Sequence, residues 1–372
     1  MEVKIERSTP IAAFMAFGTK GDVYPIAAVA TAFACDQRKY DVVFITHSAH
    51  QDIAAHLAES NVRYAPISSP PVLPPPESNE DDDNSLALSF SIHKRTVTWE
   101  HRQECLSIME RIFGDGPSLD GDFVLINFFA LEGWTLAELF HVKCVVAAPY
   151  VVNYTAPSSF QRQFRRELPL LYRYLQEASD VELGWKDVMH WMWPLFSEDW
   201  GSWREELNLS PLPFTDPVTA SEKNSSINSE NISLNDGISL YNDHMFCFSG
   251  SLPYSWLFQK CAIAIHHGGS GATAAALKAG IPQVICPFML DQFYWAERMC
   301  WLGVAPEPLR RNQLLPENCD NVSVSEGANV LKKAIKRAMS PGIKARAQEI
   351  SKRISQENGV SEAVRILKEE IS

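Results

Sequence analysis

Two histidines and three glycines stand close together in the C-terminal third of the chain, in the sequence AIAIHHGGSGATAAALKAG. A strand-length apolar run, residues 262–265, precedes them, and an alanine-rich run typical of a helix, residues 272–279, follows them. Gly280 and Pro282 predict the end of this helix, and residues 283–286 predict the next strand. A glycine-rich turn between strand and helix presents unpaired backbone N–H groups at the positive end of the helix dipole. The stretch therefore predicts a binding site for an anion, and a phosphate-bearing ligand is the most specific form of that hypothesis.

A carboxylate lies in a second glycine-containing turn, near the N-terminus. The apolar run at residues 10–17 predicts a strand, and Asp22 and Pro25 follow it at the expected start of a helix. Asp22 has two interpretations, which the spacing leaves open: a cap of that helix, or a reactive group in the crevice where α/β sheets bind ligands. The turn lacks the three-glycine dinucleotide fingerprint, which argues against NAD here. It adds three further candidates for binding: Gly18, Thr19 and Gly21.

The N-terminal half alternates apolar, strand-length runs with helix-like stretches. The predicted strands are residues 10–17, 41–46, 62–67, 122–128 and 144–148. The predicted helices are residues 25–34, 49–60, 96–112 and 134–140. This alternation is typical of a doubly wound α/β domain with a parallel sheet.

Residues 160–203 form a helical region rich in aromatic side chains, with arginines between the first of them. One interpretation is helical packing in which the arginine stems lie along apolar surface. The other is an apolar acceptor pocket with a basic rim suited to an anionic membrane surface. Helical packing is the favoured interpretation.

A polar stretch divides the chain. Residues 211–237 are low in apolar side chains and rich in Ser, Asn and Asp, which is typical of a linker. A chain of 372 residues is long enough for about two domains of ordinary size. We expect an N-terminal domain over residues 1–210, a linker over 211–240, and a C-terminal domain with terminal helices over 241–372.

Composition narrows the classes of partner. The net charge of -12 argues against nucleic acid, because phosphate backbones bind basic faces. The eight cysteines form no CxxC pair, so reduced thiols are expected instead of disulfides or a zinc site. No run approaches the roughly 18 apolar residues of a membrane-spanning helix. We expect a soluble, cytoplasmic protein, with peripheral membrane contact as a further expectation.

An acidic, proline-rich stretch at residues 70–84 has no periodicity and is typical of an exposed loop. It includes Asp81 and Asp83, which formally make a D-x-D metal clamp. A metal site of this kind is expected after an apolar strand, whereas this one follows prolines, so a solvated charge run is favoured. We predict no metal site and no cofactor.

Six motifs together resemble the family-1 glycosyltransferases of GT-B fold, and most of all their sterol 3-β-glucosyltransferase branch of plant type. The resemblance is specific because the motifs keep their order and spacing at both ends of the chain. It covers residues 10–210 and 241–372. The motifs are GTKGDVYP (18–25), TH (46–47), WLF (256–258), HHGGSGAT (266–273), AGIPQ (279–283) and PFMLDQFYWA (287–296).

The resemblance implies an α/β GT-B fold, in which two Rossmann-like, doubly wound domains face a cleft. It implies a UDP-sugar donor in the C-terminal domain, a sterol or other lipid acceptor in the N-terminal one, and inverting transfer of glucose without a metal. Asp22 matches the family's general base. The positions that match donor-binding residues are Ser251 and Leu252 by the uracil, His267, Gly269, Ser270, Gly271 and Ala272 at the diphosphate, and Asp291 and Gln292 at the sugar.

The sequence departs from the family pattern at two places. Ala272 stands where the family usually has Thr, which removes a hydroxyl near the phosphate but keeps the backbone N–H. Between residues 217 and 244 the family has a long further stretch with the first strands and helices of the donor domain, so we expect an incomplete C-terminal domain. An active UDP-glucose:sterol glucosyltransferase and a non-catalytic lipid-binding or partner-binding relative both remain open. An NAD-dependent oxidoreductase is a weak third alternative, because no suitable acidic ribose ligand follows the glycines.

Overall fold

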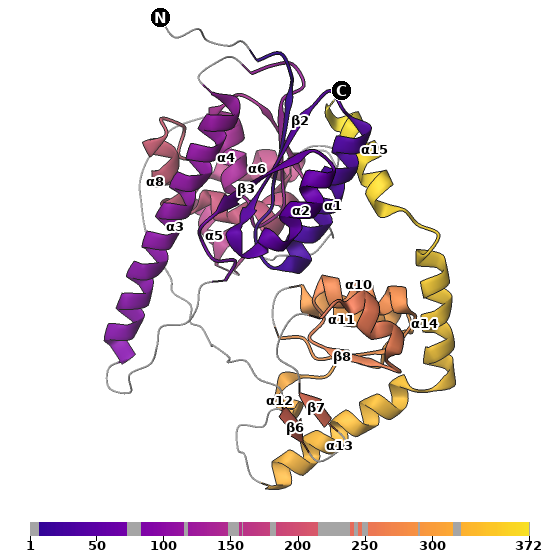
Figure 1. The fold of residues 1–372 in the computed structure, drawn as a ribbon. Coiled ribbons are helices and arrows are strands. Elements are labelled where there is room, and N and C mark those ends of the chain that lie inside the picture. The colour runs from indigo at the N-terminus through magenta and orange to yellow at the C-terminus, as the bar shows by residue number, and fades with distance from the viewer. Residues whose placement is uncertain are drawn as a thin grey trace, which may run out of the picture. The chain divides into compact units, whose positions relative to one another are not determined.

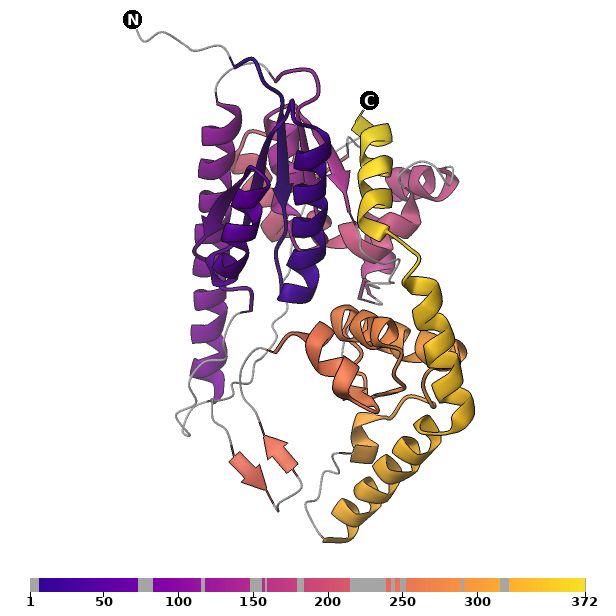
Figure 2. The same ribbon diagram turned by 45° about the vertical axis from the view of Figure 1, so that its right-hand side comes forward.

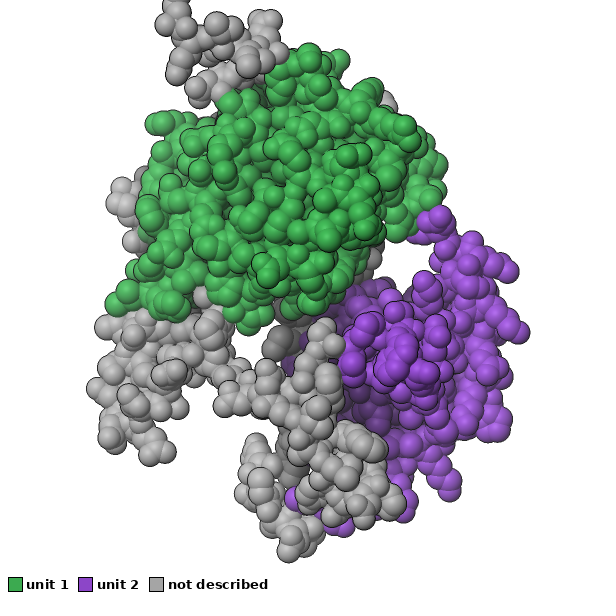
Figure 3. Space-filling view, in the orientation of Figure 1, with its two compact units in different colours: residues 1–233, 360–372 green, residues 234–359 purple. Residues whose placement is uncertain are grey.

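The computed structural model describes residues 7–72, 83–114, 118–147, 156–157, 159–178, 184–214, 239–241, 245–247, 252–288, 291–314 and 321–371. The side chains of residues 83–91, 239–241, 245–247 and 321–323 are not described. The chain forms two compact units: unit 1 holds residues 1–233 and 360–372, and unit 2 holds residues 234–359 (Figure 3). Most of the predicted linker, residues 215–238, lies outside the described residues.

Unit 1 is built on a five-stranded parallel sheet, as the apolar runs predict. Its strands are β1 (Ile11–Met15), β2 (Asp41–His47), β3 (Val62–Ile67), β4 (Phe123–Ile126) and β5 (Lys143–Val146). Their order in the sheet is β3-β2-β1-β4-β5, and every neighbouring pair is parallel. The chain runs outward from β1 to β3 and then returns to the other side of β1. The carboxyl ends of β1 and β4 therefore flank the switch point where α/β sheets bind ligands.

Helices cover both faces of this sheet (Figure 1). Alternate residues of β1 enter opposite cores: Phe14 packs with α1 on one face, and Met15 packs with α3 and α4 on the other. The helices are α1 (Lys20–Asp36), η1 (Ser48–Ile53), α2 (Ala54–Glu59), α3 (Asp83–Phe113), α4 (Glu132–Leu139), α5 (Phe160–Glu167), α6 (Pro169–Glu177), α7 (Trp185–Asp187), η2 (Val188–Met192), η3 (Trp193–Phe196) and α8 (Glu198–Glu206).

Two helices begin five or more residues earlier than the sequence predicts. Helix α1 begins at Lys20 because the turn before it supplies a cap, so Pro25 lies inside the helix and forgoes one backbone hydrogen bond. Helix α3 begins at Asp83 instead of residue 96, since the intervening residues contain no Pro or Gly that would end it. Asp83 is thus helical, whereas Asp81 and Asp82 lie outside the described residues.

The last helix, α15 (Gly359–Ile371), belongs to unit 1, although the sequence assigns residues 360–372 to the C-terminal domain. Its apolar residues Val364 and Leu367 are buried in the core that contains α1, beside which α15 lies (Figures 1 and 2). Lys368 also pairs with Asp36 at the end of α1, at 2.9 Å. An apolar stripe indicates that a helix face is buried but not which surface covers it.

Unit 2 is a smaller α/β unit with two short sheets among its described residues. Strands β8 (Ala264–His266) and β9 (Gln283–Ile285) are parallel, and β6 (Ser239–Tyr241) and β7 (Met245–Cys247) are antiparallel. The incomplete C-terminal domain expected from the sequence stays a prediction, because several stretches of unit 2 lie outside the described residues. Its helices are α9 (Tyr254–Leu257), η4 (Phe258–Lys260), α10 (Ser270–Ala279), α11 (Gln292–Trp301), α12 (Arg311–Leu314), α13 (Asn321–Ala338) and α14 (Pro341–Ile354).

Among the described helices, none combines the length and the apolar composition that crossing a membrane requires. The cysteines described with their side chains are all free thiols, as expected.

Candidate functional site

The turn between β1 and α1 presents Asp22. Asp22 is the third residue of α1, and its Oδ2 accepts hydrogen bonds from the backbone N–H of Thr19 at 2.9 Å and from the Thr19 hydroxyl at 2.7 Å. The carboxylate therefore caps the helix, as one of the two interpretations predicts. Its second oxygen, Oδ1, has no hydrogen-bond partner among the described residues, so capping leaves one oxygen available.

Gly18 is required for this arrangement. Its φ of 100° lies in the region that L side chains rarely adopt. A Cβ at this position would also lie 2.8 Å from Asp22 Oδ2 and 3.1 Å from Cδ2 of Phe129. The glycine thus lets the backbone lie directly against the carboxylate.

Burial raises the pKa of the half-buried Asp22 carboxyl above its usual value. The hydrogen bonds from Thr19 and the charge of His50 act in the opposite direction but do not cancel the burial. A carboxylate with raised basicity and one available oxygen, next to the switch point of the sheet, has the properties of a general base.

Asn127, at the end of β4, holds the Asp22 turn from the neighbouring strand. Its Oδ1 accepts from the N–H of Phe17 at 3.2 Å, and its Nδ2 donates to the Phe17 carbonyl at 2.9 Å and the Asp22 carbonyl at 3.3 Å. The side chain is buried, and these bonds satisfy it. Asn127 is not among the residues predicted from the sequence; the available signal was a lone amide ending an apolar strand beside the switch point.

A buried polar cluster lies beyond this turn, at the carboxyl end of β2. The His47 Nδ1 atom lies 2.8 Å from the Ser69 carbonyl, and the Ser69 hydroxyl lies 2.7 Å from Nδ1 of His101. His101 Nε2 lies 3.7 Å from a carboxylate oxygen of Glu132. Burial, and secondarily the charge of His101, lowers the pKa of His47 to about 4. His47 is therefore neutral near pH 7. Among the described residues, no group of three or more His, Cys, Asp or Glu side chains is arranged to hold a metal ion.

The Glu132 carboxyl has the opposite balance. Burial acts to raise its pKa, but the interaction with the nearby His101 ring outweighs burial and leaves the pKa of Glu132 below its usual value. Glu132 is therefore an ionised group inside the fold, which is stabilised by His101. Only His47 of this cluster was noted from the sequence, as part of the TH motif.

The glycine-rich turn of unit 2 is shaped by His266. Its Nδ1 accepts from the N–H of Gly268 at 3.0 Å, so Nε2 carries the hydrogen that bonds Oε1 of Gln283 at 2.8 Å. Burial lowers the pKa of His266 more than the hydrogen bond to Gln283 raises it. With both ring nitrogens engaged, His266 holds the turn and is not available to a ligand.

His267 is the available histidine of the pair. It is exposed, and no described group hydrogen-bonds to it. Its ring lies against the backbone of Gly269, where a Cβ would come within 2.6 Å of His267 Nε2. Helix α10 begins immediately after, and its first in-helix backbone bond runs from Thr273 N–H to the Gly269 carbonyl. The N–H groups of residues 270–272 thus remain open beside His267, which is an arrangement that binds anions.

The predicted sugar-binding pair lies next to this turn. Gly268 has a φ of 93°, and a Cβ there would lie 2.8 Å from Ile285 and 3.0 Å from the backbone oxygen of Gln292. Asp291 accepts a hydrogen bond from the Trp295 indole at 3.1 Å, and Gln292 accepts one from the N–H of Phe288 at 2.9 Å. The structure therefore brings the turn and this pair together within unit 2.

The remaining predicted donor residues have different outcomes. Ala272 is buried in α10, so it can offer a ligand its backbone N–H and not its side chain. Leu252 is exposed just before α9, which packs on α10. Ser251 lies outside the described residues. Asp22 belongs to unit 1, whereas all of these residues belong to unit 2.

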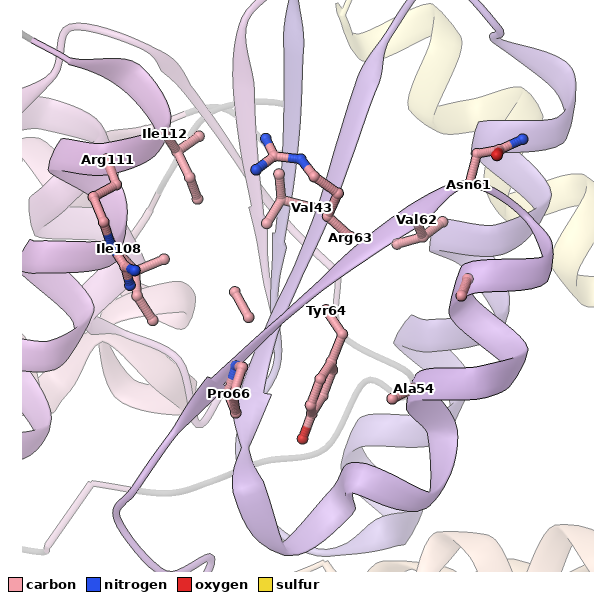
Figure 4. Close-up of a pocket in the computed structure, with 12 residues that line it drawn as sticks. Val43, Ala54, Asn61, Val62, Arg63, Tyr64, Pro66, Ile108, Arg111 and Ile112 are labelled. Carbon is pink, nitrogen blue, oxygen red and sulfur yellow. The ribbon is translucent and has the colours of Figure 1, made fainter.

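A separate hollow of about 750 Å³ lies at the outer edge of the unit 1 sheet, lined by β3, α2 and α3 (Figure 4). Tyr64, Arg63 and Arg111 line it together with apolar side chains. None of the predicted site residues contributes to it.

Comparison with known proteins identifies the part of the chain that contains the glycine-rich turn. A family described as "Erythromycin biosynthesis protein CIII-like, C-terminal domain" matches residues 246–354. These residues are similar to the C-terminal domain of that family. The matched residues include His267, the start of α10, and the Asp291–Gln292 pair.

The same region is similar to sterol 3-beta-glucosyltransferases. One from Arabidopsis thaliana is 38% identical over 112 residues, which are 30% of this chain and 16% of the relative. Another, from Komagataella phaffii, is 41% identical over 124 residues, which are 33% of this chain and 9% of the relative. The match therefore spans less than a fifth of the length of these relatives.

Solved structures resemble the whole chain in fold. The glycotransferase of kitacinnamycin aligns over 98% of this chain and 100% of its own, with a TM-score of 0.55 and 13% identity. The calicheamicin glycosyltransferase CalG4 aligns over 97% and 98%, with a TM-score of 0.53 and 15% identity. At these identities the likeness establishes the fold alone, which is GT-B. The residues that match the family model, 246–354, lie in unit 2.

Proposed function

We propose that this protein is an inverting glycosyltransferase that moves glucose from UDP-glucose to the 3β-hydroxyl of a sterol. The observation that carries the proposal is the juxtaposition in unit 2 of His267, the open N–H groups at the start of α10, and the Asp291–Gln292 pair. This juxtaposition lies in the region that is 38% identical to a sterol 3-beta-glucosyltransferase. It joins a place for a diphosphate to hydrogen-bonding groups for a sugar.

The donor would occupy unit 2. In this proposal His267 and the N–H groups of residues 270–272 hold the diphosphate, because a helix N-terminus and an imidazole together favour negative charge. Asp291 and Gln292 receive the sugar hydroxyls, and Ser251 and Leu252 lie by the uracil. A sterol is the proposed acceptor for unit 1.

The proposed reaction is a single displacement. One oxygen of Asp22 accepts the proton of the acceptor hydroxyl as the hydroxyl oxygen forms a bond to the anomeric carbon. The bond from that carbon to the diphosphate oxygen breaks, and its electron pair leaves with UDP. His267 and the α10 N–H groups stabilise the charge that develops on the leaving diphosphate. We propose that these groups serve without a metal.

Glucose transfer to a sterol tests the proposal directly. The full chain is incubated with radiolabelled UDP-glucose and sterol-containing vesicles, with and without EDTA, and the lipid extract is counted. We expect radiolabel from UDP-glucose to appear in sterol glucoside, in an amount that EDTA does not change. Calorimetric titration with UDP is run in parallel. Sterol binding without UDP binding would contradict the proposed enzyme activity and support a lipid-binding relative.

The pH dependence of transfer should report Asp22. Because folding raises the pKa of this carboxyl, the base is protonated at a higher pH than an ordinary aspartate, and transfer should fall as pH drops through that raised pKa. The same shift means that protonated Asp22 favours the folded state, a contribution that is lost as pH rises through the same range. Thr19→Val removes a hydrogen bond to the ionised form, so its acid limb should move to higher pH. A pH–rate profile of both proteins checks this, and an unmoved limb would contradict the assignment.

A further inference from the structure

His50, in the 3-10 helix η1, is a buried histidine with a hydrogen bond on one side of its ring. Its side chain is 3% exposed, and Nε2 lies 2.8 Å from the carbonyl oxygen of Gly18. A carbonyl can only accept a hydrogen bond, so Nε2 carries the hydrogen and donates it. The other ring nitrogen, Nδ1, is buried and has no partner in the described part of the chain.

The Gly18 carbonyl belongs to the turn that places Asp22. Gly18 is in the left-handed region, and its backbone lies so close to Asp22 that a Cβ would fall 2.8 Å from Oδ2. Rotation of the Gly18 peptide would therefore move the atoms that contact the carboxylate, and the bond from His50 opposes that rotation.

A second link joins η1 to α1, but it is exposed. Asp52 accepts hydrogen bonds from Lys20 at 2.8 Å and from the Tyr24 hydroxyl at 2.6 Å. The Lys20 and Asp52 side chains are 47% and 52% exposed, and ion pairs of this kind contribute little. The bond to Gly18 comes from the buried His50 side chain and is itself part-buried, so it is the stronger restraint on the turn. The Asp52 link offers a matched control.

We propose that His50 is a positioning residue for Asp22, which holds the Gly18 carbonyl through Nε2 so that the carboxylate keeps its orientation. This inference rests on the proposed function, in which Asp22 accepts the acceptor proton. Filling space does not account for a histidine here, because its buried Nδ1 has no partner among the residues that the structure describes. The donor at Nε2 is the property that the geometry uses.

Two substitutions by amide side chains test the Nε2 donor separately from the rest of the ring. In His50→Gln the amide nitrogen can occupy the place of Nε2 and keep the bond to Gly18, whereas in His50→Asn the shorter side chain cannot reach it. The kcat of His50→Gln should stay within about threefold of the unchanged protein, and that of His50→Asn should fall about tenfold to a hundredfold, as expected for a displaced catalytic group. The KM for UDP-glucose should stay constant in both, because the donor residues belong to unit 2. Asp52→Ala should leave kcat unchanged.

Hydrogen exchange of the amides of residues 17–22 provides a readout that does not depend on transfer. Exchange should be faster in His50→Asn than in His50→Gln, which should match the unchanged protein. Equal kcat in the two variants, whether high or low, would overturn the positioning role. If neither the unchanged protein nor any variant transfers glucose, the proposed function fails. Equal hydrogen exchange in the unchanged protein and all variants would then also contradict the restraint of the turn by His50. Thermal unfolding of each variant establishes that it is folded.

Discussion

Asp22→Asn is expected to lower kcat for glucose transfer by roughly 10²- to 10⁴-fold, the range that a positioned general base contributes. The substituted amide keeps an oxygen that can accept both hydrogen bonds from Thr19, so the cap of α1 should survive. It cannot accept the proton of an attacking hydroxyl. UDP affinity should be unchanged, because the residues assigned to the donor belong to unit 2. Steady-state kinetics together with calorimetric titration of UDP separates these effects.

Stability distinguishes the catalytic interpretation of Asp22 from the purely structural one. Burial raises the pKa of this carboxyl, so its ionised form is less favourable in the folded chain than in the unfolded one. The neutral amide avoids this cost at neutral pH, so the melting temperature of Asp22→Asn should equal or exceed that of the unchanged protein. Asp52→Asn, which removes one exposed charge beside the same helix, is the matched control and should retain transfer. A folded Asp22→Asn protein with full activity would remove the base assignment.

The five parallel strands of unit 1 were predictable because buried strands are short continuous apolar runs, which lack the hydrophobic periodicity of a helix. The glycine-rich turn was predictable for a similar reason, since its chemistry is local: strand, glycines and helix are consecutive in the chain. The start of α1 was not predicted correctly, because the Thr19–Asp22 cap begins the helix before Pro25, the residue that indicated its start in the sequence.

The side chains that hold the Asp22 turn could not be predicted from spacing. Asn127 bonds Phe17 from a position 110 residues away, and that contact exists only once β1 and β4 are neighbours. His50 likewise hydrogen-bonds to the Gly18 carbonyl, which lies 32 residues earlier in the chain. The amide of Asn127 at the end of an apolar strand marks that residue as a candidate, but its partner is set only by the fold, and no local pattern marks His50. The placement of α15 in unit 1 could not be predicted for the same reason, because the apolar face of a helix does not indicate which surface covers it.

His267→Ala is expected to weaken UDP binding and to lower kcat/KM for UDP-glucose by roughly 10²- to 10³-fold, the usual effect of removing one group that stabilises developing charge. His267 is exposed and bonded to no described group, so its loss should leave the fold of unit 2 intact. Calorimetric titration with UDP and a thermal melt measure both. His266→Ala is the contrasting variant: it removes the bonds to Gly268 and Gln283 and should lower the melting temperature as well.

Gly269→Ala tests the same group without removing the imidazole. The added Cβ would come within 2.6 Å of His267 Nε2, so the ring must move away from the start of α10. If His267 acts together with the α10 N–H groups, this displacement should weaken UDP binding by an amount comparable to His267→Ala. The double variant should then bind UDP no more weakly than either single one, because both changes remove the same interaction. Fully additive losses would mean that the glycine and the histidine act independently, and UDP affinity within twofold of the unchanged protein in His267→Ala would exclude His267 from the diphosphate site.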